Sequence, residues 1–417
     1  MKFIADFHIH SKYSRATSKD MDLEHLDKWA KIKGIKVLGT GDFTHPEWFD
    51  SLKRNLVLSE AGLFRLKSSN SNNGTRFILT SEISCIYSKN NKVRKIHILI
   101  FAPDFQTVEK INTQLGWVGN LKSDGRPILG IDAKEVVKIV LGISSHCLIV
   151  PAHIMTPWFS LFGSKSGFDS LKDCFEEYSN YIFAGETGLS ANPLMLWRMA
   201  DARRITLLSN SDAHSPQKLG REANVFDTEI SYPAIIEAIK SKNPKKFLYT
   251  IEFFPEEGKY HYDGHRLCGI RLSPEESKKY NNICPNCKKP LTIGVLNRVE
   301  KLADKEEGFK PADAIPFKSL VPLIEVISEA IKQTISSKQT IAEYENLIKK
   351  FGTEFEVLLN VSKSDLESAC LPEIAEAIIR VREGRVELEP GYDGVFGKIR
   401  IFSQKEEKEV LKQTTLF

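Results

Sequence analysis

The sequence predicts an α/β protein whose long first part alternates strands with helices, followed by a small cysteine-containing module and a helical last part. Three observations lead to this prediction. Short runs rich in β-branched residues alternate with helical patterns up to about residue 255. Three cysteines lie close together at positions 268, 284 and 287. From about residue 298 onward, apolar residues recur at helical spacing.

Seven runs in the first part have the length and composition of buried strands. They are Phe3–His8, Lys36–Thr40, Phe77–Cys85, Lys95–Phe101, Cys147–Ala152, Tyr181–Gly185 and Ile205–Ser209. Helical patterns lie between several of them, at Leu23–Lys33, Ala133–Leu141, Leu194–Arg203 and Pro233–Lys240. Strands that alternate with helices usually pair in parallel, so residues 1–255 are expected to form either a barrel or a doubly wound sheet.

The rest of the chain divides into three parts of different composition. Residues 256–297 contain the clustered cysteines and too little apolar sequence for a core of their own. Residues 298–402 are expected to be helical, with many lysines that suit either a solvated helix face or DNA backbone contact. The elements predicted there are helices at Pro316–Thr334, Thr340–Phe351 and Pro372–Val386, and a strand at Lys398–Phe402. Residues 403–417 have the composition of a flexible, solvated tail.

The composition indicates a globular protein without a membrane anchor. Hydrophobic residues make up 41% of the 417 residues and charged residues 27%, which is enough apolar material for a packed core. No apolar run approaches the ~18 residues of a transmembrane helix, and Asp6 interrupts the N-terminus too early for a secretory signal. A cytoplasmic location is therefore expected. The net charge of +4 permits nucleic-acid binding without indicating it.

Histidines and carboxylates recur at the ends of the predicted strands. His8 and His10 form a His-x-His pair after the first strand, and an extended segment places both imidazoles on one side. The other members of this set are Asp42, His45, Glu82, His97, His153, Asp212 and His214. Strand ends of an α/β barrel converge on one face, so these side chains predict a polynuclear site for zinc, manganese or iron. Glu186 also ends a strand, where it could support a ligand or serve as a structural carboxylate.

The order of these motifs resembles that of the polymerase-and-histidinol-phosphatase (PHP) superfamily over residues 1 to about 250. The matching motifs are Asp6-Phe7-His8-Ile9-His10-Ser11-x-Tyr13-Ser14, Gly41-Asp42, Glu82, His97, Ala152-His153 and Ser211-Asp212-Ala213-His214. The resemblance implies a distorted seven-stranded (β/α) barrel that hydrolyses phosphoesters with two or three divalent metals. It implies a first metal on His8, His10, Glu82 and Asp212, a second on Glu82, His97 and His153, and a third position near Asp42 and His214.

Two departures from the superfamily pattern affect the third metal position. Arg15 stands where members often have Asp or His, and Phe43 follows Asp42 where members often have His. His45 could replace the missing ligand, or the third position could be empty. Arg15 could instead bind a substrate phosphate through its fork of N–H groups, or it could be an ordinary surface arginine.

Metals in such a site would carry the chemistry without a nucleophilic side chain. Two ions ~3.5–4 Å apart lower the pKa of a bridging water and stabilise the attacking and leaving oxygens, so Glu82 and Asp212 are predicted to be catalytic together with Arg15. Zinc is the first choice for these ions, with manganese or magnesium as alternatives. The sequence has no Gly-x-x-x-x-Gly-Lys-Ser/Thr motif, which argues against NTP hydrolysis of the P-loop type.

The cysteine cluster predicts a separate, structural zinc site. His265-x2-Cys268 and Cys284-Pro285-Asn286-Cys287 are two chelating pairs with the spacing of a tetrahedral zinc site. His261 competes with His265 for the fourth position, and His265 is preferred because its spacing mirrors that of the cysteine pair. The module has little else to hold it folded, so the metal is expected to supply much of its stability.

The end of the chain carries a candidate binding peptide. Leu416 and Phe417 follow a polar tail, and an exposed apolar pair of this kind indicates a partner that buries it. Together with Gln413 they resemble a shortened form of the peptide by which archaeal replication and repair proteins dock on the PCNA sliding clamp.

Five features together resemble those of the archaeal endonuclease Q family. They are the barrel motifs, the His/Cys module, the segment Ala314-Ile315-Pro316-Phe317-Lys318-Ser319-Leu320, the turn Pro390-Gly391-Tyr392-Asp393-Gly394 and the tail. The resemblance covers essentially the whole chain and implies a nucleoid-associated DNA repair nuclease. It would cut on the 5′ side of a deaminated base (hypoxanthine, uracil or xanthine) or an abasic site, leaving a 3′-hydroxyl and a 5′-phosphate. Residues 298–402 would then contact DNA.

An enzyme of this kind must extrude the damaged base to read it. Trp158 and Phe159, which follow His153, are candidates to stack on that base, or they could be core aromatics. The alternative functions are a small-molecule phosphoesterase, a single-strand exonuclease and an inactive PHP scaffold. The long C-terminal extension disfavours the phosphoesterase, and the intact ligand set disfavours the scaffold.

Overall fold

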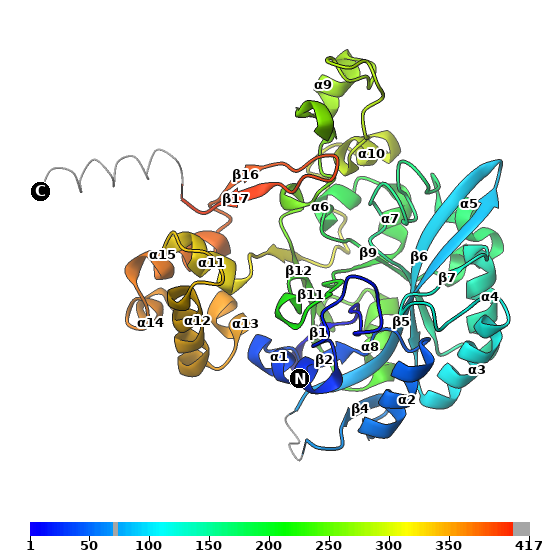
Figure 1. Cartoon of the computed structure of the whole chain (residues 1–417), viewed down its shortest axis with the longest axis horizontal. Coiled ribbons are helices and arrows are strands. Elements are labelled where there is room, and N and C mark those ends of the chain that lie inside the picture. The colour runs from blue at the N-terminus through cyan, green and yellow to red at the C-terminus, as the bar shows by residue number, and fades with distance from the viewer. Residues whose placement is uncertain (70–73, 403–417) are drawn as a thin grey trace, which may run out of the picture.

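The chain has a mixed α/β fold with a central sheet (Figure 1). The computed structural model describes residues 1–69 and 74–402. Eleven strands form this sheet, with the order β15-β12-β11-β1-β2-β5-β4-β3 along its main path, while β6 and β7 pair with β5 and β8 pairs with β6. The strands are β1 (Lys2–Asp6), β2 (Val37–Gly39), β3 (Leu56–Glu60), β4 (Leu63–Leu66), β5 (Arg76–Lys89), β6 (Lys92–Ala102), β7 (Ile128–Leu129), β8 (Leu148–Pro151), β11 (Ala223–Asp227), β12 (Phe247–Glu252) and β15 (Phe317–Ser319). A separate parallel pair consists of β9 (Ala184–Glu186) and β10 (Thr206–Leu208).

Each of the seven predicted strand regions contains a strand, but the expected parallel pairing holds only in part. The pairs β1–β2, β2–β5 and β9–β10 are parallel, whereas β1–β11, β5–β6 and β6–β8 are antiparallel. The cause is clearest between β5 and β6, which are joined by Asn90 and Asn91 with φ of 54° and 56°. Two such residues form the tight turn of a β-hairpin, which only antiparallel strands can share.

One buried cluster draws side chains from ten strands. It contains residues of β1, β2, β4, β5, β6, β8, β9, β10, β11 and β12, and Phe7 and Phe101 make an edge-to-face contact within it. These strands therefore surround a common core. Side chains that alternate with this cluster, such as Leu38 and Leu79, pack instead against the surrounding helices.

Eight α-helices lie in the described residues before residue 255. They are α1 (Leu23–Lys33), α2 (Pro46–Asn55), α3 (Phe105–Gly116), α4 (Ala133–Ile143), α5 (Leu171–Phe175), α6 (Pro193–Leu196), α7 (Ala200–Arg204) and α8 (Tyr232–Ser241). Several start where an Asp or Ser side chain accepts a bond from a free N–H of the first turn, for example Asp22 at α1 and Asp132 at α4. The single helix predicted over Leu194–Arg203 is two short helices, α6 and α7.

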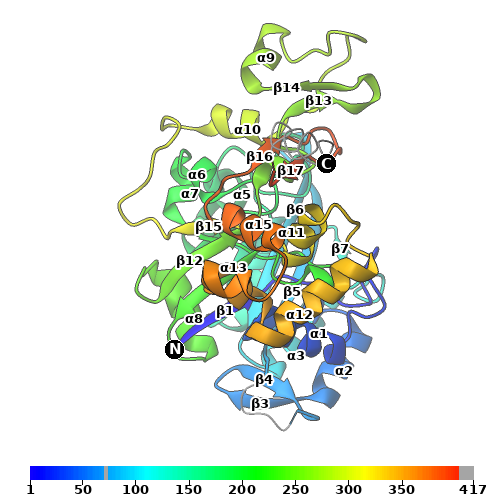
Figure 2. The same ribbon diagram turned by 90° about the vertical axis from the view of Figure 1, so that its left-hand side faces the viewer.

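Helices α11–α15 form a group on the left in Figure 1. The elements of the last part are α10 (Val295–Leu302), α11 (Leu323–Ala330), α12 (Lys338–Phe351), α13 (Glu354–Leu359), α14 (Lys363–Glu367), α15 (Pro372–Arg382) and a hairpin of β16 (Glu387–Glu389) and β17 (Lys398–Arg400). The helix predicted from Pro316 is wrong at its start, because β15 occupies Phe317–Ser319 and adds to the sheet beside β12 (Figure 2). Pro322 explains the boundary, since a proline favours the start of a helix over its interior.

The cysteine-containing module projects from the rest of the chain at the top of Figure 1. It consists of β13 (Asp263–His265), β14 (Ile270–Leu272) and α9 (Pro274–Lys279). The chain enters and leaves it at one place, because the Val295 N–H donates to the Tyr260 carbonyl over 2.7 Å. Among the described residues, no helix is long and apolar enough to cross a membrane.

A buried ion pair joins α1 to the C-terminal helices. Lys33 Nζ lies 2.7 Å from a carboxylate oxygen of Glu354, and the two side chains are only 4% and 5% exposed. Glu354 also accepts hydrogen bonds from the Tyr344 hydroxyl (2.6 Å) and the Leu323 N–H (3.1 Å). The carboxylate is therefore fully satisfied, and Lys33 depends on it for its countercharge.

A Glu354→Ala variant is expected to lower the free energy of unfolding by about 3–5 kcal/mol, because it leaves the Lys33 ammonium buried without a partner. Urea denaturation followed by circular dichroism measures this loss. Lys138→Ala is the matched control, since it removes an exposed pair with Glu135 (3.3 Å) worth about 0.5 kcal/mol or less. Equal losses in both variants would contradict the assignment.

The predicted clamp-binding residues Gln413, Leu416 and Phe417 lie outside the described residues. They therefore remain a prediction from the sequence.

Candidate metal centre

Two groups of potential metal ligands meet at one site and share Glu82. The first contains His8, His10, Glu82 and Asp212, and the second contains Glu82, His97 and His153. Within each group the ligand atoms all lie within 4.8 Å of one another. The side chains come from β5 and β6 and from the segments that directly follow β1, β8 and β10.

The two carboxylate oxygens of Glu82 face different groups. Oε2 lies 3.5 Å from His8 Nε2 and 3.3 Å from His10 Nε2. Oε1 lies 2.8 Å from His97 Nδ1 and 3.2 Å from His153 Nε2. Glu82 is thus placed to bridge two cations. Asp212 completes the first group, with Oδ1 3.0 Å from His10 Nε2.

Two further carboxylates orient the histidines of the first group. Glu186 places both oxygens 3.0 Å from His8 Nδ1 and also accepts from the Asn210 side chain and the His153 N–H, each over 2.9 Å. Asp42 lies 3.1 Å from His10 Nδ1. A carboxylate behind the imidazole fixes the ring and makes its other nitrogen a better ligand. Of the two readings of Glu186, the contacts favour ligand support.

The structure does not bring Asp42, His45 or His214 into either group. The Asp42 carboxylate is occupied by bonds from the Ser11 N–H (2.6 Å), the Ser11 hydroxyl (2.7 Å) and the Ser14 hydroxyl (2.8 Å). His45 stacks on Tyr13 with ring centroids 4.4 Å apart. His214 Nδ1 lies 2.9 Å from the backbone oxygen of Asp212, while its ring lies 4.5 Å from that of His10. Among the described residues, these three side chains therefore do not form a ligand group for the third metal that the sequence predicted.

Three residues at the site have left-handed backbone conformations, which residues other than glycine rarely adopt. Asp42, His153 and Asp212 have φ of 49°, 30° and 47°. Each costs on the order of 1–3 kcal/mol, and such residues cluster at functional sites. Gly188 makes room for one of them, because a Cβ there would lie 2.6 Å from the His153 Cβ.

The electrostatics favour charged carboxylates at this centre. Burial alone would raise the pKa of Glu82, but the adjacent His97 imidazole, the Arg126 guanidinium and His8 hold that pKa well below its ordinary range. Burial also opposes ionisation of Asp212, yet its hydrogen bond with His10 and the charges of His8 and His10 lower its pKa. Burial lowers the pKa of His97 to about 4, so this imidazole is neutral and free to bind a cation.

The donor set fits divalent cations. His8 Nε2 is buried and has no hydrogen-bond partner among the described residues, although it lies 3.5 Å from Glu82 and 3.8 Å from Asp212. A buried polar atom without a partner is costly unless something binds it. Imidazole nitrogens and carboxylate oxygens converging in this way suit zinc, manganese or iron.

Arg126 reaches the centre directly, although no sequence motif pointed to it. Its Nη1 donates to Glu82 Oε2 over 3.0 Å, and the side chain is 27% exposed. Arg15 instead is 79% exposed and pairs with Asp124 at 3.2 Å. Asp124 also accepts from the Arg126 N–H at 3.1 Å, so one carboxylate organises both arginines. Arg126 lies in a segment without periodicity between α3 and β7, which is why pattern reasoning missed it.

A cleft of about 660 Å³ adjoins the metal-ligand groups. Its walls include His153 and Asp212 together with the aromatic residues Phe253, Tyr260 and Phe396. Trp158, 37% exposed, makes an edge-to-face contact with Tyr260 at 5.8 Å. Phe159 instead packs on His97 with ring centroids 4.8 Å apart. Of the two predicted stacking residues, Trp158 therefore lies beside the cleft, while Phe159 packs against a potential metal ligand.

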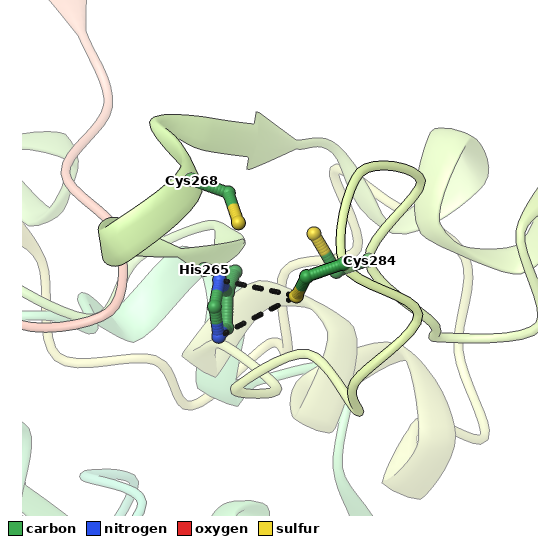
Figure 3. A group of neighbouring side chains, drawn as sticks. His265, Cys268 and Cys284 are labelled. Atoms are coloured by element: carbon green, nitrogen blue, oxygen red, sulfur yellow. Dashed lines mark hydrogen bonds between the residues drawn. The ribbon is translucent and has the colours of Figure 1, made fainter.

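The His/Cys module contains a separate candidate metal site. His265, Cys268, Cys284 and Cys287 bring their ligand atoms within 4.8 Å of one another. Figure 3 shows His265, Cys268 and Cys284 pointing toward a common centre, and Cys287 Sγ lies 3.8 Å from His265 Nδ1. His261 is buried elsewhere and stacks on Tyr262 with ring centroids 5.5 Å apart. Of the two histidines, it is His265 that joins the cysteines.

Two family models match parts of the chain. The model described as PHP-associated matches residues 195–244, and the model of the MJ0043 C-terminal domain matches residues 322–385. The uncharacterized protein MJ0043 of Methanocaldococcus jannaschii is 38% identical over 263 residues, which are 60% of this chain. The match spans only 32% of that protein's length.

Two solved structures match almost the whole chain. The lesion-specific endonuclease PfuEndoQ from Pyrococcus furiosus is 32% identical, with a TM-score of 0.85 over 98% of this chain and 99% of that one. A complex of endonuclease Q with a 27-mer duplex that has an abasic lesion at the active site is equally similar, over 97% and 98% of the two chains. The chain therefore belongs to the endonuclease Q family, which comprises metal-dependent endonucleases of the PHP superfamily.

Proposed function

We propose that this chain is a DNA repair endonuclease that hydrolyses the phosphodiester on the 5′ side of an abasic site or a deaminated base, with a 3′-hydroxyl and a 5′-phosphate as products. The observation that carries the proposal is the position of Glu82, which is shared by two ligand groups beside a cleft of about 660 Å³. An abasic lesion lies at the active site of the endonuclease Q complex, which supports the same substrate here.

The catalytic roles follow from the contacts of each side chain. His8, His10, Glu82 and Asp212 would hold one divalent ion, and Glu82, His97 and His153 a second, with zinc as the first choice and manganese or magnesium as alternatives. Such ions supply an activated water and stabilise negative charge on the phosphate.

Arg126 would bind the scissile phosphate. One of its N–H groups reaches Glu82, and the remaining N–H groups of the guanidinium can donate to a non-bridging phosphate oxygen. Arg15 is more exposed and would bind a neighbouring phosphate of the same strand. Glu186 and Asp42 would keep His8 and His10 in their ligating orientations.

The architecture that we propose around this site has four parts. Residues 1–255 would form the distorted seven-stranded barrel, residues 256–297 a module braced by one structural zinc, and residues 298–402 a DNA-contacting region. The four ligand atoms grouped within 4.8 Å support the zinc assignment. Gln413, Leu416 and Phe417 in the tail would dock on the PCNA clamp, a proposal that rests on the sequence alone.

A cleavage assay tests the proposed function. Labelled at its 5′ end, a duplex with one central abasic site or deoxyinosine is incubated with the protein and Mg²⁺, Mn²⁺ or Zn²⁺, beside an undamaged duplex. The proposal predicts one product that ends directly 5′ of the lesion. A ladder from the ends would indicate an exonuclease, and phosphate release from small esters alone would indicate a phosphoesterase.

A further inference from the structure

Glu257 is a carboxyl group of the cleft that the metal chemistry does not use. It ends a short 3-10 helix (Pro255–Glu257) that connects β12 to the His/Cys module. It also lines the same cleft as His153 and Asp212. Its Oε2 is shielded from solvent and has no hydrogen-bond partner among the described residues. A buried carboxylate oxygen without a partner is unfavourable, so an unused one on the wall of a cleft indicates a ligand group that would satisfy it.

Among the described residues, the nearby cations form no ion pair with Glu257, and each has another partner. Lys218 of the loop after β10 pairs with Glu325 of α11 at 2.7 Å. Arg221 donates to the backbone oxygens of Ser211 and Asp212 over 2.7 and 3.3 Å. The Glu257 carboxyl group therefore remains available to a ligand that enters the cleft.

Aromatic side chains beside Glu257 provide surfaces for a planar ligand. Tyr260 lines the cleft three residues further along the chain, and Phe396, 59% exposed, lies on the β16–β17 hairpin. The hairpin is fixed to this wall because the Gly397 N–H donates to the Glu257 carbonyl over 3.0 Å. Lys259 lies over the Phe396 ring at 4.4 Å. Aromatic faces next to a buried polar group are the usual components of a nucleobase pocket.

We propose that Glu257 reads the edge of the extruded base by accepting a hydrogen bond from its ring N–H. This inference rests on the proposed function. Hypoxanthine and xanthine carry this hydrogen on N1 and uracil carries it on N3, whereas adenine and cytosine have an acceptor at the same position. The carboxyl oxygen would therefore attract the deaminated bases and repel adenine and cytosine, the undamaged parents of hypoxanthine and uracil.

The surroundings of Glu257 also favour a second bond to the base. Burial, together with the charges of Glu325 and Glu329 on α11, raises the pKa of Glu257 to about 7, although Lys218 and Arg221 act in the opposite direction. A protonated carboxyl group donates to the carbonyl oxygen next to the ring N–H, so both atoms of the lactam edge would be satisfied. Guanine and thymine share this edge, but stable pairing keeps them in the helix.

Single-turnover cleavage of two duplexes tests the inference, one with deoxyinosine and one with an abasic site that has no base to read. Glu257→Leu is expected to lower the ratio of deoxyinosine to abasic cleavage about 10-fold to 100-fold, the usual size of lost base recognition. Glu257→Gln keeps a donor and an acceptor and is expected to retain most of the ratio. Glu256→Leu, at the neighbouring carboxyl group that is not among the residues lining the cleft, is the matched control and is expected to change both rates equally.

The pH dependence provides a second readout from the same substrates. In the wild type the ratio is expected to fall as the pH rises through about 7, because the deprotonated carboxylate loses its donor and repels the base carbonyl. Glu257→Gln is expected to show no such fall. Identical pH profiles for the two proteins, or an equal loss on both duplexes in Glu257→Leu, would overturn the inference. Failure of the wild type to cut either duplex would instead overturn the proposed function.

Discussion

A Glu82→Gln variant is expected to cut an abasic duplex at least ~10³-fold more slowly than the wild type, which corresponds to about 4 kcal/mol of transition-state stabilisation. The two oxygens of Glu82 face different ligand groups, at 3.3 Å from His10 and 2.8 Å from His97. An amide offers one neutral oxygen in place of two charged ones, so it cannot hold both cations. Single-turnover kinetics measures the loss of cleavage rate, and metal analysis of the purified variant measures the loss of bound metal.

The control for this variant is Glu186→Gln, which changes a carboxylate that touches His8 but not the predicted cations. Loss of a carboxylate behind a ligating histidine costs about 10-fold to 100-fold, and added metal should restore part of the activity. Added metal should not rescue Glu82→Gln. If Glu82→Gln kept its metal content and cut within tenfold of the wild-type rate, Glu82 would not be the shared ligand.

A Cys284→Ser variant is expected to lose one equivalent of bound zinc and the folded state of residues 256–297. Cys284 is fully buried within the His/Cys group, and zinc supplies about 10–16 kcal/mol of apparent binding energy in comparable small modules. Limited proteolysis should then cut inside this segment while the rest of the chain stays resistant. Metal analysis by mass spectrometry counts the lost ion.

Cys370→Ser is the matched control for the zinc prediction. Cys370 is partly buried, lies outside the group, and its thiol donates to the Leu366 carbonyl over 3.3 Å. Its replacement should leave the zinc content and the proteolysis pattern unchanged. Loss of zinc in both variants, or in neither, would contradict the assignment of the site.

The potential ligands could be predicted because their positions depend on local geometry. His8 and His10 share one side of an extended segment, and Glu82 and His97 lie within adjacent antiparallel strands, where Glu82 pairs with Leu99 and Ser84 with His97. The same reasoning placed Asp42 among the ligands, yet its left-handed backbone and the bonds from Ser11 and Ser14 direct its carboxylate behind His10. Residue type and strand position do not distinguish a ligand from the group that supports it.

Other features depend on contacts between segments far apart in sequence. Arg126 approaches Glu82 only because its loop folds back over β5, and Glu257 enters the cleft because the β16–β17 hairpin packs on its backbone. Strand β15 was predicted as helix, since three residues beside a proline carry little periodicity and only pairing with β12 makes them a strand. Tertiary context decides each of these cases.

The His/Cys module could be removed or replaced by engineering, because the chain enters and leaves it at one place. Tyr260 and Val295 are joined by a backbone hydrogen bond of 2.7 Å, so the module is a loop insertion whose two ends already meet. A short glycine-containing turn in place of residues 262–293 would close this gap while the pairing of β12 with β15 is kept. Such a deletion would yield an enzyme without the His/Cys module, and a foreign domain could be grafted at the same junction.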